Sequence, residues 1–178
     1  MITDHEVQAA KNGDKEAFIR LIRLVEQPLF QTAKAIVRND EDTADTLQET
    51  ILKAYKSIHQ LRESTYFKTW IFRILINECN TILSKRSRVI LTDDGVSFTE
   101  PVSDEYEGVY LREALNRINS KQRIVIILHY FQDMTLKQIA ETLSLSESAV
   151  KKWLKQAKLE LFKQLKSSER GLNNYEPI

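Results

Sequence analysis

Apolar residues recur every three to four positions along most of the chain, which is the spacing of amphipathic helices. In the first half, this pattern predicts helices over residues 4–12, 14–38, 40–60 and 65–86. In the second half, it predicts helices over residues 109–118, 121–131, 135–143 and 146–166. Gly13 is expected to end the first helix, and Pro28 to kink or split the second.

Residues 89–108 lack this period and separate two helical blocks, 1–88 and 109–178. The segment carries six acids and no base, a net charge of −6, whereas the blocks before and after it carry +2 and +5. The predicted fold class is therefore all-α: two small helical domains joined by an acidic linker. A solvated spacer is an equally good interpretation of the linker.

Composition narrows the class of protein further. The chain has 178 residues, of which 42% are hydrophobic and 29% charged, as in an ordinary soluble globular protein. The longest apolar run, residues 124–128, is far shorter than the roughly 20 residues that span a bilayer. The N-terminus shows no secretory signal. A cytoplasmic protein is expected.

No catalytic or metal-binding pattern is visible. The three histidines are far apart, and neither a glycine-rich phosphate loop nor a nucleophile–base arrangement is present. Cys79 and His129 both lie in apolar helical patterns and are expected to be packed residues. We therefore expect no enzyme activity, no metal and no cofactor.

The sharpest motif is in the second block. Thr135 is placed to N-cap one helix, and Ser146 to N-cap the next after a three-residue turn. This layout is typical of a helix-turn-helix, whose second helix would enter the major groove with serine, lysine and glutamine side chains. Ser144 occupies the turn position that glycine usually fills. A plain amphipathic hairpin is the alternative interpretation.

Two helices of the first block also carry patterned polar faces. Over 65–86, a stripe of Arg73, Asn77 and Asn80 follows the polar loop Arg62–Tyr66, a combination that suits unstacked bases and phosphates. Trp70 in this helix is more typical of a core residue than of a stacking platform. Over 40–60, the predicted apolar face is Ala44, Leu47, Ile51, Ala54, Tyr55 and Ile58. By pattern alone, the opposite face is a solvated surface.

Together these motifs resemble the extracytoplasmic-function (ECF) group of bacterial RNA polymerase sigma factors, over about residues 8–166. Residues 42–55 resemble the core-polymerase-binding helix, region 2.2. Residues 67–77 and the basic end at Arg88 resemble regions 2.3 and 2.4, and residues 135–158 resemble region 4.2. The order and spacing of the three stretches around an acidic linker make the resemblance specific.

The resemblance implies a factor that binds the clamp and flap of core RNA polymerase and directs initiation at promoters with −10 and −35 elements. The residues implied to face the clamp are Asp45, Gln48, Glu49 and Lys53. Those implied to bind the single-stranded −10 element are Arg62, Ser64, Tyr66, Lys68, Trp70, Arg73, Asn77, Asn80, Lys85 and Arg86. Those implied to bind the −35 duplex are Arg123, Thr135, Ser146, Ser148, Lys151, Lys152, Lys155 and Gln156.

The family also implies control by an anti-sigma factor, often membrane-bound, as part of a stress response. Trp153 departs from the polar residue that relatives often have on the reading helix; it would either pack in the core or contact thymine methyls. Two other functions stay open. One is a stand-alone helix-turn-helix regulator, which would usually dimerise on palindromic half-sites. The other is a helical interaction module without a DNA role.

Overall fold

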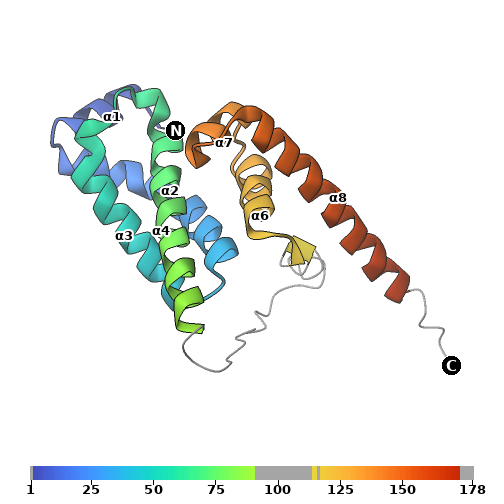
Figure 1. Ribbon diagram of the computed structural model, residues 1–178. Coiled ribbons are helices and arrows are strands. Elements are labelled where there is room, and N and C mark those ends of the chain that lie inside the picture. Colours follow the sequence, from blue (N-terminus) through green and yellow to red (C-terminus); the bar gives the residue numbers. More distant parts are fainter. Residues whose placement is uncertain (1, 91–113, 116, 173–178) are drawn as a thin grey trace.

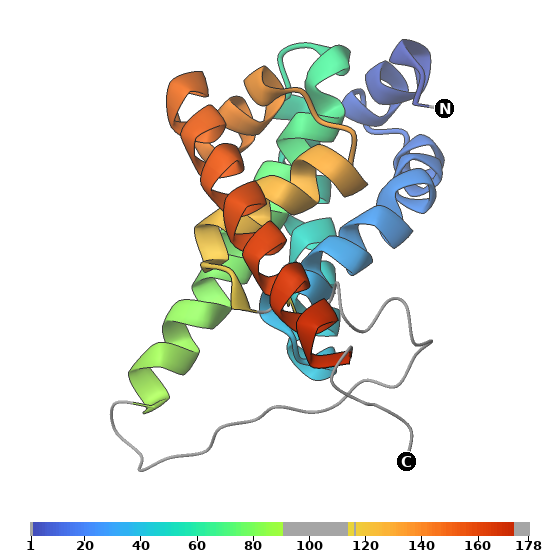
Figure 2. The same cartoon turned by 90° about the vertical axis from the view of Figure 1, so that its right-hand side faces the viewer.

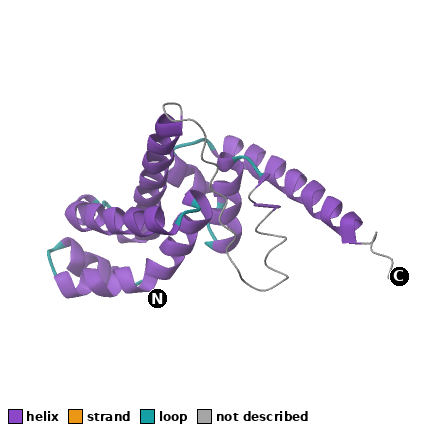
Figure 3. Cartoon of the chain, turned by 90° about the horizontal axis from the view of Figure 1, so that it is seen from below, coloured by secondary structure: helices purple, strands orange, loops and turns teal. Residues whose placement is uncertain are grey.

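The computed structural model describes residues 2–90, 114–115 and 117–172. Within these residues every regular element is a helix, arranged in two lobes that lie side by side (Figures 1 and 3). The all-α class is therefore confirmed. Residues 91–113, which include most of the predicted linker, lie outside the described part of the chain. Of the predicted helix 109–118, the described residues 114, 115 and 117 are helical.

The first lobe begins with α1 (Asp4–Lys11) and α2 (Lys15–Val37). Gly13, with a φ of 96°, makes the turn between them, as glycine does at the left-handed end of a helix. The side chain of Asp14 caps α2 by accepting the backbone N–H of Ala17. Helix α2 continues through Pro28 without the predicted split. Proline frees the carbonyl four residues earlier, that of Leu24, and this residue lies on the exposed side of α2.

Helix α3 (Asp40–Ser57) buries a face that matches the predicted one only in part: Ala54 is buried, and Leu47 and Ile51 pack against the core as predicted. Its buried residues are Thr43, Thr46, Thr50 and Ala54, whereas Ala44 and Tyr55 are exposed. Each threonine hydroxyl donates to a carbonyl one turn earlier, at 2.6–2.7 Å. The hydroxyls are thus satisfied within the helix, and threonines can line a buried contact surface.

A 3₁₀ turn, η1 (Ile58–Gln60), ends α3, and a second, η2 (Ser64–Tyr66), leads into α4 (Phe67–Ile90). Phe67, Phe72 and Ile71 of α4 are fully buried. Each large apolar side chain of this kind contributes about 1.5–3 kcal/mol when it is withdrawn from water. Helix α4 packs on both α2 and α3, so the polar stripe predicted on it belongs to its other side.

The second lobe contains α6 (Ser120–Ile126), the π-helical turn η3 (Ile127–Phe131), α7 (Leu136–Leu143) and α8 (Glu147–Leu172). Helix α8 runs along the outer side of this lobe, nearest the viewer in Figure 2, and its C-terminal half extends past the other helices of the lobe in Figure 1. It continues to residue 172, beyond the end at residue 166 that the sequence pattern predicts.

The two lobes share one core. Buried side chains of α2 and α4 belong to the same apolar cluster as those of α6, α7 and α8. Helix α7 packs on α4, and both α6 and η3 pack on α2. In this structure the protein is therefore closed, with its second lobe seated against the first.

Candidate nucleic-acid and polymerase interface

The turn between α7 and α8 forms as the sequence predicts. Thr135 accepts the backbone N–H of Gln138, and the Gln138 side chain accepts the backbone N–H of Thr135, which completes a capping box. Ser146 caps α8 by accepting the backbone N–H of Ala149 at 3.2 Å. Between them, Ser144 adopts a left-handed conformation with a φ of 55°. A serine thus supplies the backbone geometry for which glycine is favoured.

The first half of α8 divides cleanly into a buried and an exposed side. Val150, Leu154 and Ala157 are buried against the rest of the lobe. The predicted −35 residues on this helix and at its start are all exposed: Ser146, Ser148, Lys151, Lys152, Lys155 and Gln156. The start of the helix therefore presents lysines, small hydroxyls and an amide to solvent. Such side chains can donate to phosphates and base edges in a major groove.

Trp153 packs rather than projecting with the lysines. It is half-buried against the core, and the ammonium group of Lys121 lies 5.8 Å from the centre of its ring. Of the two roles that the sequence left open for this residue, the structure favours packing. His129 and Cys79 are likewise packed: the His129 ring bonds to the carbonyl of Met134 at 2.9 Å, and Cys79 is fully buried.

Arg123 does not fit its predicted role at a phosphate. It is buried, with 6% of its surface exposed, and its guanidinium donates to the carbonyl of Leu115 at 3.5 Å. Its position inside α6, between residues that pack into the core, points the long side chain into the lobe. The sequence places Arg123 near the start of a helix, where an arginine could reach a phosphate. The sequence pattern did not reveal that this side of the helix is buried.

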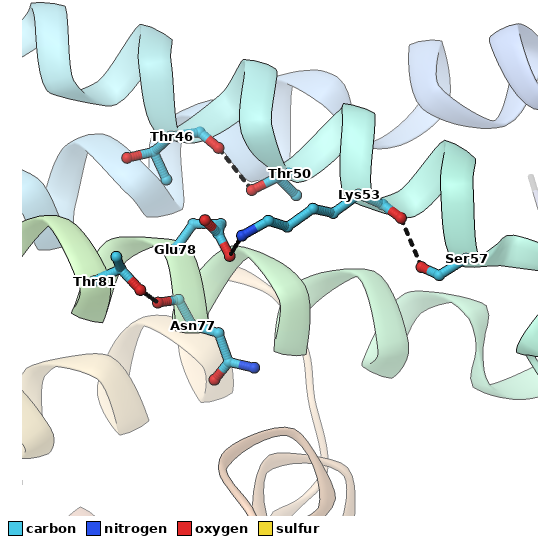
Figure 4. Close-up of polar contacts among 7 residues, drawn as sticks. All are labelled: Thr46, Thr50, Lys53, Ser57, Asn77, Glu78 and Thr81. Carbon is cyan, nitrogen blue, oxygen red and sulfur yellow. Dashed lines mark hydrogen bonds and ion pairs between the residues drawn. The ribbon is translucent and has the colours of Figure 1, made fainter.

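The polar stripe on α4 is present. Arg73, Asn77 and Asn80 are exposed, and Figure 4 shows the Asn77 amide on the side of α4 that faces away from α3. Lys68 and Trp70 precede the stripe and are half-buried. Trp70 lies 5.9 Å from Phe67, ring centre to ring centre, and packs on the core as its pattern favoured.

Two side chains of α1 bind the loop that precedes α4, residues 62–66. Gln8 donates to the hydroxyl of Ser64 at 2.9 Å, and Lys11 donates to the carbonyl of Arg62 at 3.3 Å. Ser64 is buried and already bonded, so its predicted direct contact with a base does not fit this geometry. The side chains of Arg62 and Tyr66 remain exposed. No local pattern indicates this support, because Gln8 and Ser64 are far apart along the chain.

Arg86, at the other end of the stripe, is bound within the first lobe. Its guanidinium lies 2.5 Å from the carboxylate of Asp42 and donates to the carbonyl of Val37 at 3.2 Å. It therefore ties the last turns of α4 to the corner between α2 and α3. These internal contacts make Arg86 a poor candidate for the predicted contact with DNA. The neighbouring Lys85 is exposed and stays a candidate.

The four residues predicted to face the polymerase on α3 have two different environments. Asp45, Gln48 and Glu49 are exposed. Lys53 is exposed as well, but its amine lies 2.6 Å from the carboxylate of Glu78 on α4 (Figure 4). The Glu78 side chain is only 12% exposed. Lys53 thus joins α3 to α4, a contact that the sequence did not indicate.

Neither a metal centre nor a membrane span appears in the part of the chain that the structure describes. No group of three or more histidine, cysteine or acidic side chains lies close enough together to hold a metal ion within residues 2–90, 114–115 and 117–172. Over the same residues, no helix combines the length and apolarity needed to cross a membrane.

Comparison with known families matches both lobes. The model for sigma-70 region 2 covers residues 21–89, and the model for sigma-70 region 4 covers residues 108–161. The first spans α4 with its polar stripe, and the second spans the helix-turn-helix. The chain belongs to the sigma-70 family, in its ECF group.

Relatives of this sigma factor align with most of its length. The RNA polymerase sigma factor SigV of Bacillus subtilis is 29% identical over 143 residues, which are 79% of this chain and 86% of SigV. The ECF sigma factor SigW of the same bacterium is 24% identical, over 93% of this chain and 98% of SigW. The chain thus spans nearly the whole of these relatives.

Solved structures share the fold. The sigma factor RpoE of Bartonella quintana, solved with the anti-sigma factor NepR, superposes with a TM-score of 0.76 at 26% identity. The match covers 84% of this chain and 96% of RpoE. CnrH, solved with the cytosolic domain of CnrY, superposes with a TM-score of 0.75 at 22% identity, over 94% of this chain and 99% of CnrH. This sigma factor therefore has the two-lobed fold of its relatives.

Proposed function

We propose that the two lobes of this sigma factor divide promoter recognition between them. The first lobe, within residues 1–88, binds core RNA polymerase and the −10 element, and the second, within residues 109–178, binds the −35 element. The observation that carries this assignment is the start of α8, where six of the residues proposed to bind the −35 duplex are exposed beside a fully capped turn: Ser146, Ser148, Lys151, Lys152, Lys155 and Gln156. Residues 89–108 join the two domains, and their acidity suits a path through a channel that normally holds RNA.

The first lobe offers two distinct surfaces for its two partners. The exposed acids and amide of α3, Asp45, Gln48 and Glu49, face the polymerase clamp. The stripe of Arg73, Asn77 and Asn80 follows the single-stranded −10 element. Arg62 and Tyr66 hold a base that leaves the stack, a step that costs a few kcal/mol and is offset by stacking and polar contacts. A loop supported by α1 keeps these two side chains in position.

A protein with this role works in the cytoplasm, where core polymerase and DNA are found. It acts by binding and positioning, without enzyme chemistry of its own. An anti-sigma factor is the regulator we propose, in keeping with the complex in which the RpoE relative was solved. Such a partner would link this sigma factor to a stress signal.

The alternative, a stand-alone helix-turn-helix regulator, predicts tight binding to duplex DNA without polymerase. The decisive experiment is transcription in vitro from fragmented genomic DNA, with core polymerase and this protein, followed by sequencing of RNA 5′ ends. Discrete starts that share motifs near −10 and −35, and that are absent without the protein, are expected. If a standard sigma factor is active on the same core and this protein yields no starts, the proposal is wrong.

The −35 assignment has its own test. Replacing Lys151, Lys152 and Lys155 by glutamine should weaken binding of the holoenzyme to a −35 duplex. It should also reduce the slope of log affinity against log salt by about one for each phosphate that is no longer neutralised. Lys137, exposed on α7, provides the matched control when it is replaced by glutamine. An unchanged salt slope in the triple variant would remove these lysines from the interface.

The −10 assignment is tested by Asn77→Ala. We expect this holoenzyme to assemble normally and to open the promoter poorly, as measured by permanganate reactivity of unpaired thymines. The control is Thr81→Ala, one turn further along α4, where the hydroxyl donates to the Asn77 carbonyl at 2.9 Å. Normal opening by Asn77→Ala would refute the assignment.

A further inference from the structure

The start of α6 lies beside the first half of α8, which carries the proposed −35 residues. Helix α6 packs on α8, and two side chains from the first turn of α6 reach the exposed side of α8. Gln122 donates from its amide to the side-chain oxygen of Gln156 at 3.4 Å. The ammonium group of Lys121 lies 5.8 Å from the centre of the Trp153 ring. Trp153 and Gln156 are three residues apart in α8, so they share one side of that helix.

Lys121 presents its charge to solvent. The residue is exposed, and its backbone N–H donates to the capping side chain of Asn119 at 3.0 Å. No carboxylate in the part of the chain that the structure describes forms an ion pair with Lys121. The ammonium group therefore has an indole ring on one side and water on the other.

The indole ring holds this ammonium group without neutralising it. The face of an indole attracts a cation within about 6 Å, and at an exposed site the attraction favours the contact about two- to fivefold. The ring covers only one side of the ammonium group, so its N–H donors on the other side can still bond to an anion. A lysine side chain is otherwise flexible, and a ring that limits its freedom lowers the entropy lost when the lysine binds. Trp153 thus prepares Lys121 for an anionic partner.

The surroundings of Lys121 indicate which anion it meets. Lys152 is exposed one turn before Gln156 on α8, so cations from both helices lie along the same side. In helix-turn-helix complexes, the second helix enters the major groove and neighbouring elements contact the DNA backbone. Arg123, which was predicted to hold a phosphate, is buried, whereas Lys121 lies two residues earlier and about 200° around the same helix. The accessible cation of α6 is therefore Lys121.

We propose that Lys121 binds a phosphate at the edge of the −35 duplex and that Trp153 is the residue that positions it. This inference rests on the proposed function for the identity of the DNA. The cation comes from α6, and the ring that orients it comes from α8, whose lysines lie in the groove. Because α6 packs on α8, the spacing between the groove contacts and this phosphate contact is set before DNA binds.

The pair is tested first in the free protein, without DNA or polymerase, so this result does not depend on the proposed function. The measurement is the NMR spectrum of the lysine ε-methylene groups, with the Lys121 signal assigned by its loss in Lys121→Arg. The ring current of Trp153 should shift this signal away from that of Lys163, which is exposed further along α8. Trp153→Leu should abolish the shift, and circular dichroism should show that the variant keeps its helices. A Lys121 signal that stays the same in Trp153→Leu would overturn the pairing.

The phosphate contact is tested with the holoenzyme and a fluorescent duplex that carries the −35 element of a promoter mapped by the transcription experiment. Anisotropy titrations at several salt concentrations give the affinity and its salt slope. Lys121→Gln should weaken binding and reduce the slope of log affinity against log salt by about one. Lys121→Arg should keep the parent slope, because arginine keeps the charge and also stacks on aromatic rings. Lys163→Gln is the matched control on α8 and should change neither quantity.

The positioning role of Trp153 is tested by a double-mutant cycle in the same titrations. Trp153→Leu should weaken binding about two- to fivefold in the parent chain and have no further effect in the Lys121→Gln chain. An equal loss in both chains would overturn the positioning role, because the loss would then come from packing or from the ring itself. An unchanged salt slope in Lys121→Gln would overturn the phosphate contact. If the parent holoenzyme binds the −35 duplex no better than a scrambled duplex, the proposed function fails, and this inference fails with it.

Discussion

The contact between Lys53 and Glu78 separates two roles for Lys53: binding to polymerase, or support between α3 and α4. A double-mutant cycle with Lys53→Met and Glu78→Gln distinguishes them. Glu78 does not belong to the proposed polymerase surface. A loss that both single variants share therefore reports on the contact itself, and not on polymerase binding.

The magnitude follows from the geometry of the pair. The two charged atoms lie 2.6 Å apart, the lysine side chain is 50% exposed, and the glutamate is 12% exposed. Exposed ion pairs contribute about 0.2–1 kcal/mol, and the low exposure of Glu78 places this one near the upper end, about 1 kcal/mol. Lys53→Met leaves a largely enclosed carboxylate without its cation and should cost about 2 kcal/mol. Glu78→Gln leaves an amine that water can solvate and should cost about 1 kcal/mol.

The assay is urea unfolding followed by the circular dichroism of the helices, on the two single variants and the double variant. The double variant should lose about 1 kcal/mol less than the sum of the single variants, which is the coupling energy. Lys56→Met is the matched control, because Lys56 is exposed on the same helix. It should change the free energy of unfolding by less than about 0.5 kcal/mol.

Binding to core polymerase completes the test. If Lys53 supports α4, Lys53→Met and Glu78→Gln should both retain polymerase affinity under conditions where they are folded. A coupling energy below about 0.3 kcal/mol, together with a polymerase defect in Lys53→Met alone, would refute this reasoning and return Lys53 to the polymerase surface.

Three further predictions concern stability and reactivity. Ser144→Gly should stabilise the protein by about 1 kcal/mol in urea unfolding, since glycine adopts the left-handed backbone of this turn without strain. A destabilised variant would mean that the contacts of the serine side chain stabilise the fold by more than the backbone strain costs. Arg86→Met should destabilise by about 1 kcal/mol by removing the contacts to Asp42 and Val37, whereas Lys85→Met in the same titration should have little effect. Burial raises the pKa of Cys79 to about 12, so the folded protein should react with a maleimide far more slowly than the urea-unfolded protein, and equal rates would contradict its burial. Because the unfolded thiol ionises first, this residue should also lower the stability as pH rises above about 9.

Local signals in the sequence were sufficient to predict most of the helices and the turn between α7 and α8. The caps at Asp14, Thr135 and Ser146 use side chains within three residues of the N–H groups that they accept, so spacing alone identifies them. The exposed side of α8 could be predicted for the same reason: its apolar partner residues recur with a strict helical period.

Contacts between distant segments could not be predicted in this way. The Thr43, Thr46 and Thr50 face of α3 was missed because threonine counts as polar until its hydroxyl is bonded within the helix. Arg86 and Lys53 were assigned to external partners because their internal partners, on other helices, leave no trace in the local pattern.

The support that α1 gives to the loop before α4 has a practical consequence for how this protein is produced. The matched region 2 segment starts at residue 21, beyond α1, so a chain trimmed to that segment would lose Gln8 and Lys11. Such a chain would keep α3, α4 and most of α2, yet release the loop that presents Arg62 and Tyr66. An affinity tag is therefore better placed at the C-terminus, since a bulky group next to α1 would disturb the support of that loop.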